Sequence, residues 1–190
     1  MAPNIDEALR LIDEAHTTDT RKTSSGEPYE LHYAQRMTHY LDLHTPDASA
    51  LLQVAVRAQH FRRWEVPRDS YPKTKPGYFA WRTFLKKRQS EQVKEICLTC
   101  GFGEEEAGRV ASLIAKEELK KGEGKGDEEA QVLEDCACLV FLVSAYPRVL
   151  LEVGETHAME QHEPLLFPMT EWINSSGADR RRFSLLRGLC

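Results

Sequence analysis

Apolar residues recur at helical spacing along almost the whole chain, and this periodicity restricts the fold more than any other feature. In the segment 4–16, for example, Ile5, Ala8, Leu9 and Ile12 lie on one stripe of a helix. Strand signals are scarce, because no Asn-Gly or Asp-Gly pair separates two alternating segments. The sequence therefore predicts an all-α fold.

The same periodicity predicts about six main helices in one compact domain. They span 4–16, 29–43, 47–63, 78–99, 104–120 and 127–146, with one further short helix over 168–174. Ala50–Ala58 is apolar nearly all round, which is typical of a central helix. Three prolines exclude a continuous helix between Trp64 and Gly77, and the chain beyond Pro147 is less regular. We expect 1–28 to form an N-terminal helix and loop, 29–146 the helical core, and 147–190 an extension that packs on it.

Charge and composition exclude several classes of protein. The formal charge of −5 gives no bulk attraction to nucleic acid or anionic membranes, so any phosphate recognition must come from a local cluster of bases. The longest apolar run, Cys136–Tyr146, is too short to span a membrane. Met1–Arg10 lacks the apolar centre of a secretory signal, and the five cysteines do not suggest a disulfide framework. These features predict a cytoplasmic protein, with the nucleus as a further location and no membrane partner.

Two histidines and a late carboxylate form the first candidate site. His32 and His60 lie in the second and third expected helices, and Glu134-Asp135 directly precedes the apolar run 138–143. An acid at the edge of a buried segment is costly unless it is paired, protonated or bound to metal. Two imidazoles and one carboxylate from three helices would suit a divalent metal ion. The alternative is ordinary helix histidines and an acid paired with an arginine.

A run of basic and aromatic residues forms the second candidate site. Bases, aromatic rings and prolines alternate there, which suits an anionic ligand that carries both a phosphate and a ring, because guanidinium groups bind phosphate oxygens and rings stack. The alternative is a solvated basic surface. The residues that we expect to bind the ligand are Arg62, Arg63, Trp64, Arg68, Tyr71, Tyr78, Trp81 and Arg82.

Four cysteines offer a rival metal site. Cys97 and Cys100 form one pair and Cys136 and Cys138 another, and the two pairs together could bind zinc. Neither pair lies in a glycine-rich knuckle, and free cysteines are common in protein cores. A nucleophilic cysteine is less favoured still, because no base lies beside one in the sequence.

The combination of these motifs resembles a family of uncharacterised proteins from fungi, plants and bacteria, catalogued as a domain of unknown function. The resemblance covers roughly 29–141. Some fungal members are labelled glutamyl-tRNA synthetase, a label that does not suit a chain of this length without a synthetase nucleotide-binding motif. The matching stretches are 32–37 (HYAQRM), 57–65 (RAQHFRRWE), 70–72 (SYP), 77–78 (GY), 81–82 (WR) and 131–142 (QVLEDCACLVFL).

That family is similar in pattern to the HD superfamily of helical, metal-dependent phosphohydrolases. The resemblance implies that His32 matches the first histidine, His60 the histidine of the His-Asp pair, and Asp135 the late aspartate. Phe61 stands where the pair has its aspartate, so one ligand of the usual set is missing. The resemblance thus implies a weak site, a substitute acid such as Glu117 or Glu134, or a site that no longer binds metal.

Two functional hypotheses follow. The first is a phosphohydrolase for a small, nucleotide-like substrate, using Mn, Fe, Co, Ni or Mg bound by His32, His60 and Asp135. Glu134 or Glu117 would orient the ligands or the water. Basic side chains of the run 62–82 would neutralise the phosphoryl group, and its aromatic rings would stack on the ligand. The second hypothesis is a non-catalytic module that binds a nucleotide, an RNA end or a protein through the same run; nucleic acid is the less favoured partner.

Overall fold

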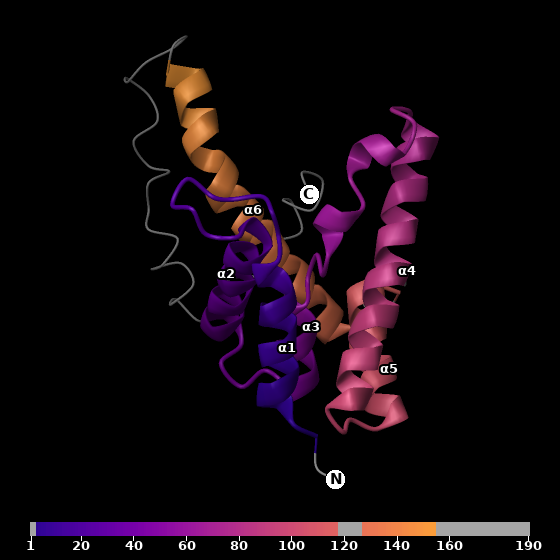
Figure 1. Ribbon diagram of the computed structural model, residues 1–190. Helices are drawn as coiled ribbons and strands as arrows, with labels where there is room; N and C mark the ends of the chain where they lie inside the picture. Colours follow the sequence, from indigo (N-terminus) through magenta and orange to yellow (C-terminus); the bar gives the residue numbers. More distant parts are fainter. Residues whose placement is uncertain (1–2, 118–126, 155–190) are drawn as a thin grey trace.

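The computed structural model describes residues 3–117 and 127–154, with 144–154 as helix backbone only. Within these ranges the fold is all-α, as predicted, and strand pairing is limited to an isolated bridge between Lys22 and Pro28. No helix of this part of the chain has both the length and the apolar character to cross a membrane. The helices are α1 (Ile5–Thr17), α2 (Tyr29–His44), α3 (Ala50–Arg57), α4 (Lys75–Thr99), α5 (Glu104–Ala115) and α6 (Glu128–Gly154), with 3-10 turns at Arg63–Glu65 and Arg68–Ser70 (Figure 1).

One hydrophobic core joins all six helices. α4 packs along α5, α2 packs along α6, and α3 contacts both α2 and α5, while α1 closes the bundle against α2, α3 and α4. In Figure 1 the first half of α4 extends beyond α5, which packs beside the second half. Each helix contributes fully or almost fully buried apolar side chains: Ala8, Ile12, Met37, Leu41, Val54, Val56, Val93, Cys97, Val110, Leu113, Leu133 and Leu139.

Local capping explains where several helices begin. The side-chain oxygen of Asn4 accepts a hydrogen bond from Glu7 N at 3.0 Å, and Ser49 Oγ accepts one from Leu52 N at 3.1 Å. Thr74 caps α4 in the same way, and a proline is tolerated in the first turn of that helix. α4 therefore begins at residue 75, three residues before the predicted start at 78.

Three helix ends differ from the prediction. α5 ends at Ala115 rather than at residue 120, because Lys116 (φ 59°) takes a left-handed conformation. α3 ends at Arg57 rather than at residue 63, because His60 (φ 62°) and Arg62 (φ 49°) adopt left-handed backbone conformations between which Phe61 enters the core. A helix cannot continue through such residues. α6 continues through Pro147 to Gly154, where an irregular chain was expected. The predicted helix over 168–174 lies outside the described residues.

Arg57 holds α1 and α2 against the end of α3. Its Nε and Nη2 atoms donate to the carboxylate of Asp13 at 2.6 and 2.7 Å, and its Nη1 donates to Thr38 Oγ1 at 3.0 Å. The ring of His16 lies 3.2 Å from the Arg57 carbonyl oxygen through Nε2. These bonds anchor the chain at the point where it leaves α3 and enters the irregular segment that carries the candidate site.

Candidate functional site

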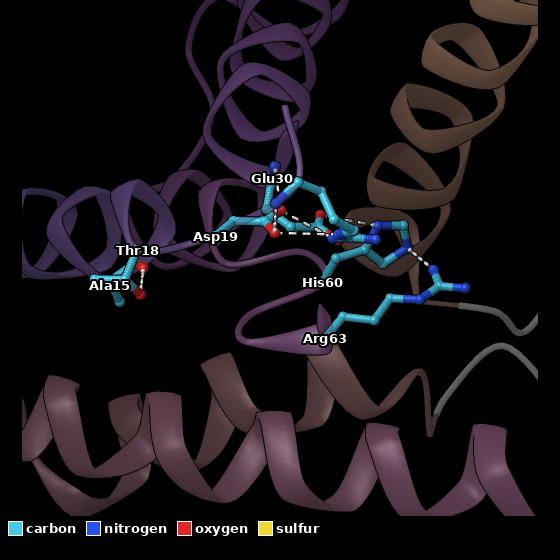
Figure 2. Close-up of polar contacts among 7 residues, drawn as sticks. Ala15, Thr18, Asp19, Glu30, His60 and Arg63 are labelled. Carbon is cyan, nitrogen blue, oxygen red and sulfur yellow. Dashed lines mark hydrogen bonds and ion pairs between the residues drawn. The ribbon is translucent and has the colours of Figure 1, made fainter. Parts of the chain in front are cut away.

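A buried carboxylate at the start of α2 forms the base of the site. Glu30 is only 1% exposed, and its backbone N–H donates to Asp19 Oδ2 at 3.1 Å. Arg21 Nη2 donates to both carboxylates, at 2.6 Å to Glu30 Oε1 and 2.9 Å to Asp19 Oδ2. The loop before α2 therefore supplies one guanidinium group that neutralises two buried acids. Figure 2 labels these acids, Asp19 and Glu30.

One ring nitrogen of His60 faces this carboxylate, and the other ring nitrogen faces Arg63 (Figure 2). Its Nδ1 atom lies 3.5 Å from Glu30 Oε2, and Arg63 Nη1 donates to its Nε2 atom at 2.8 Å. A guanidinium group can only donate, so Nε2 must be the accepting nitrogen and Nδ1 carries the proton. The ring of Tyr33 stacks on the imidazole, with centroids 4.4 Å apart and planes at 19°. The orientation and tautomer of His60 are thus set from three sides.

The surroundings keep this imidazole neutral at neutral pH. The pKa of His60 is lowered to about 4, chiefly by burial. The positive charges of Arg63 and Lys116 contribute to this lowering, and Glu30 opposes it. Burial alone would raise the pKa of Glu30, but hydrogen bonds from His60 and Arg21 outweigh burial and hold that pKa below its ordinary value. The pair is therefore a neutral imidazole backed by a carboxylate.

A small hollow opens beside His60, and its lining is strongly basic. Its volume is about 30 Å³, close to that of one water molecule, so a larger ligand would extend out of it. No acidic side chain lines it within the described part of the chain. The lining residues are Gln59, His60, Arg63, Arg82, Leu85, Lys86, Gln89, Ile114 and Lys116. Four cationic side chains in one hollow favour an anion.

Backbone strain coincides with this hollow. His60 (φ 62°) and Lys116 (φ 59°), which both line it, adopt left-handed conformations that residues other than glycine seldom take. Such strain costs of order 1–3 kcal/mol per residue and clusters at functional sites. Lys116 is also the C-cap of α5, a position where left-handed residues are common. The strain at His60 is therefore the backbone feature that favours the hollow as the candidate site.

Arg63 is held in place by a buried tryptophan rather than by an acid. Its guanidinium group lies 5.0 Å from the centre of the Trp81 ring, and Trp81 Nε1 donates to Val66 O at 3.0 Å. No carboxylate of the described residues forms an ion pair with Arg63, and burial lowers its pKa. Its one strong acceptor is the imidazole of His60, so an incoming anion can compete for it.

The three predicted metal ligands lie in separate environments. His32 Nδ1 is 2.9 Å from Glu27 Oε2, and Asp135 Oδ1 accepts a hydrogen bond from Gln131 Nε2 at 2.6 Å. Across residues 3–117 and 127–143, no three His, Cys, Asp or Glu side chains gather as a group that could hold a metal ion. His32, His60 and Asp135 are therefore not brought together as one ligand set in this conformation.

The other predicted acids take different positions. Glu134 pairs with Lys116 and so adjoins the hollow from α6. Glu117 is exposed beyond the end of α5. The ring of Phe61, 2% exposed, packs edge-on against His16 at 5.8 Å. Phe61, which the resemblance to the HD superfamily aligns with an aspartate, is thus part of the core.

Of the eight predicted ligand-binding residues, the structure brings Arg63 and Arg82 to the hollow, and Trp81 supports Arg63 from behind. Arg62 lies 3.8 Å from Glu65, and Trp64 packs near His16. Arg68, Tyr71 and Tyr78 lie outside the lining, around the start of α4: Arg68 donates to the Tyr71 carbonyl oxygen, and its guanidinium group lies 5.9 Å from the Tyr78 ring.

The cysteines behave as core residues. Cys97, Cys100, Cys136 and Cys138 are all buried. Burial raises the pKa of the Cys97 and Cys136 thiols to about 12, which disfavours the thiolate needed for nucleophilic attack or metal binding.

Sequence reasoning missed several members of the site, among them Glu30, Tyr33 and Lys116. Glu30 reads as an ordinary acid in the first turn of a helix, and its burial depends on Arg21 and Asp19, which the sequence does not connect to it. Tyr33 lies within a recognised motif, but its contact with His60 depends on the irregular turn after α3. Lys116 follows α5 with no local signal. The one available hint was an acid at position 30 just before an expected buried stripe.

A family model described as "Domain of unknown function (DUF4202)" matches residues 6–158 of the chain. None of the curated proteins and none of the solved structures in the comparison matches it. The matched range includes all six helices apart from Ile5, the first residue of α1, and every residue that lines the hollow.

Proposed function

The chain belongs to the family described as domain of unknown function DUF4202, and we propose that it binds and hydrolyses a small phosphorylated compound whose phosphoryl group enters the basic hollow. One observation carries the proposal: a neutral imidazole, backed by a buried carboxylate, opens into a hollow with four cationic side chains and no acidic one among its described lining residues. This arrangement combines a proton acceptor with an anion site.

Binding would begin with an exchange of partners at Arg63. A phosphate oxygen is a stronger acceptor for a guanidinium group than an imidazole nitrogen, because its charge assists the hydrogen bond. Arg63 would turn from His60 to the phosphoryl group, joined there by Arg82 and Lys116. The exchange frees His60 Nε2, and the nearby anion raises the pKa of the imidazole from about 4 towards neutrality.

The chemical step would then use His60 as a general base. A water molecule attacks phosphorus, its proton passes to Nε2, and the bond between phosphorus and the leaving oxygen breaks. The leaving oxygen takes a proton from the protonated imidazole or from solvent. Glu30 stabilises the imidazolium, since its carboxylate lies 3.5 Å from Nδ1.

A divalent metal is what the resemblance to HD phosphohydrolases implies, with His32, His60 and Asp135 as its ligands. As they lie, these residues do not fit one ion, since they form no ligand group and Arg63 occupies Nε2 of His60. A cation would also face the repulsion of the surrounding bases. No step of the proposal therefore passes through a metal, and metal dependence stays a separate prediction.

A non-catalytic phosphate-binding module is the second candidate. Phe61 favours it, because a core phenylalanine in place of the aspartate that the HD resemblance implies is what the loss of a catalytic site would leave. The hollow would still bind the phosphate of a ligand. The two candidates thus share the anion site and differ in whether the bound ester is cleaved.

Phosphate release from p-nitrophenyl phosphate and a panel of nucleoside monophosphates tests the proposal, with and without EDTA and with Mn²⁺ restored. We expect His60→Gln to lower kcat/KM about a hundredfold or more. His39→Gln, at an exposed histidine of α2, is the matched control and should retain activity. Activity that EDTA abolishes and Mn²⁺ restores would favour the metal-dependent version.

Thermal shifts with the same compounds separate the two candidates. Ligand stabilisation that Arg82→Met removes, without turnover by the wild-type protein, would favour the module. Full activity in His60→Gln refutes the catalytic role, and a lack of both turnover and stabilisation refutes both candidates.

A further inference from the structure

A second surface leads away from the hollow along α4. Lys75, Tyr78, Phe79, Arg82 and Lys86 are spaced at i, i+3, i+4, i+7 and i+11, so they share one face of the helix. We call these five residues the α4 stripe. Arg82 and Lys86 also line the hollow, so the stripe runs from the hollow towards the N-terminal half of α4. This half of α4 extends beyond α5 in Figure 1.

The stripe exposes two large rings next to cationic groups. Phe79 is 56% exposed and Tyr78 is 42% exposed, with ring centroids 5.8 Å apart. The guanidinium group of Arg68 lies 5.9 Å from the centre of the Tyr78 ring, and Tyr78 lies 6.1 Å from Trp81, which Arg63 covers. Rings and cations therefore follow one another without interruption from His60 to Phe79.

The charge of this region is opposite to that of the chain. Residues 68–88 carry seven basic residues and one acidic one, whereas the whole chain has a formal charge of −5. The acid, Asp69, pairs with Lys73 at 3.1 Å. A face that combines positive charge with exposed rings is suited to a polyanion that carries flat groups.

We propose that the α4 stripe binds a single-stranded oligonucleotide whose terminal phosphate occupies the basic hollow. The inference rests on the proposed function only for the phosphate site; the stripe itself is an independent observation. Exposed rings can stack on unpaired bases, which a duplex does not offer. From Lys75 to Lys86 the helix rises about 16 Å, roughly the length of five stacked nucleotides. The inference thus extends the proposed substrate from a small phosphorylated compound to the terminal phosphate of an oligonucleotide.

Fluorescence anisotropy with the full chain tests this inference. The probes are oligouridylates of about eight nucleotides with a 5′-phosphate, a 3′-phosphate or no terminal phosphate, together with a duplex and uridine monophosphate. We expect a terminally phosphorylated single strand to bind about tenfold or more tightly than the duplex and the mononucleotide, with affinity that falls steeply as salt rises.

Two phenylalanines on α4 provide a matched pair of variants. Phe79→Ala should weaken oligonucleotide binding about fivefold or more, from the loss of one stacking platform. Phe84→Ala removes a ring of similar exposure (45%) about 140° away around the helix, and it should leave binding unchanged. Neither variant should alter the thermal shift with inorganic phosphate, which reports on the hollow alone.

The outcomes separate this inference from the proposed function. Oligonucleotides that bind no more tightly than uridine monophosphate, or equal losses in the two phenylalanine variants, overturn the inference and leave the hollow's function intact. Equal affinity for oligonucleotides with and without a terminal phosphate would show that the hollow does not bind that phosphate, and would overturn this part of the inference. An acidic aromatic peptide that binds as tightly as the oligonucleotide overturns the choice of partner.

Discussion

Acidification should destabilise the protein through His60, and the size of the effect follows from its burial. The unfolded chain takes up a proton on this imidazole near its ordinary pKa of 6.5, whereas the folded protein resists protonation until about pH 4. Between these values the proton favours the unfolded chain, so stability is lower at the acidic end. Each pH unit of this window costs roughly 1.4 kcal/mol, which makes the whole window worth about 3 kcal/mol.

Urea unfolding of the wild-type protein and of His60→Gln, followed by circular dichroism from neutral pH to about pH 4, measures this contribution. Glutamine does not titrate, so the variant should lose about 3 kcal/mol less than the wild type over this range. Glu30 acts in the same direction, since its lowered pKa also removes stability as the pH falls, and it adds to the wild-type loss. The buried His16 is present in both proteins and cancels.

The pH dependence of the free energy of unfolding in the two proteins tests whether the folded state keeps His60 neutral. Parallel pH dependence in the two proteins would show that the folded state protonates His60 as readily as the unfolded chain does, and the neutral imidazole of the site would be refuted. Histidine NMR titration of the folded protein provides an independent measure, in which the His60 resonance should move only near the acidic end of the range.

Three further variants test the packing and charge pairs of the fold by urea unfolding. Gly77→Ala should destabilise the protein by about 2 kcal/mol or more, because the new Cβ would lie 2.2 Å from a proline carbonyl oxygen. Gly108→Ala, with open space around it, should instead stabilise the protein by about 0.5 to 1 kcal/mol. Equal stabilities of the two variants would contradict the observed packing. Arg109→Gln should lower the free energy of unfolding by about 2 kcal/mol and return the pKa of Asp127 from about 2 towards its usual 3.8. The loss of stability in acid that protonation of Asp127 causes in the wild type should then be absent from the variant's calorimetric pH profile. Ser49→Ala should cost about 1 kcal/mol through the lost cap of α3, and an unchanged midpoint would exclude that role.

The helices were predictable from the sequence because their signals are local. Apolar periodicity and a capping side chain such as Asn4 act within a few residues, so all six predicted starts fall within three residues of the observed ones. The end of the third helix was not predictable in this way. Its apolar pattern continues to Phe61, but tertiary packing turns this ring inward through left-handed neighbours, a choice that no local pattern records.

The site was only partly predictable for a related reason. His60, Arg63 and Arg82 carry obvious chemistry and lie in a conspicuous run, so the sequence could name them as candidates. Glu30 and Lys116 acquire their roles from distant partners, and only the assembled structure brings them to the imidazole. The metal ligand set stays a prediction, since His32 and Asp135 have other partners here.

The left-handed backbone at His60 and Lys116 also bears on protein engineering. Glycine would adopt both conformations without steric penalty, so selection of variant libraries for heat resistance alone should enrich glycine or asparagine at these two positions. Survivors of such a screen would carry neither the imidazole nor the ammonium group beside the hollow. Substitutions at positions 60 and 116 that raise heat resistance should therefore weaken ligand binding.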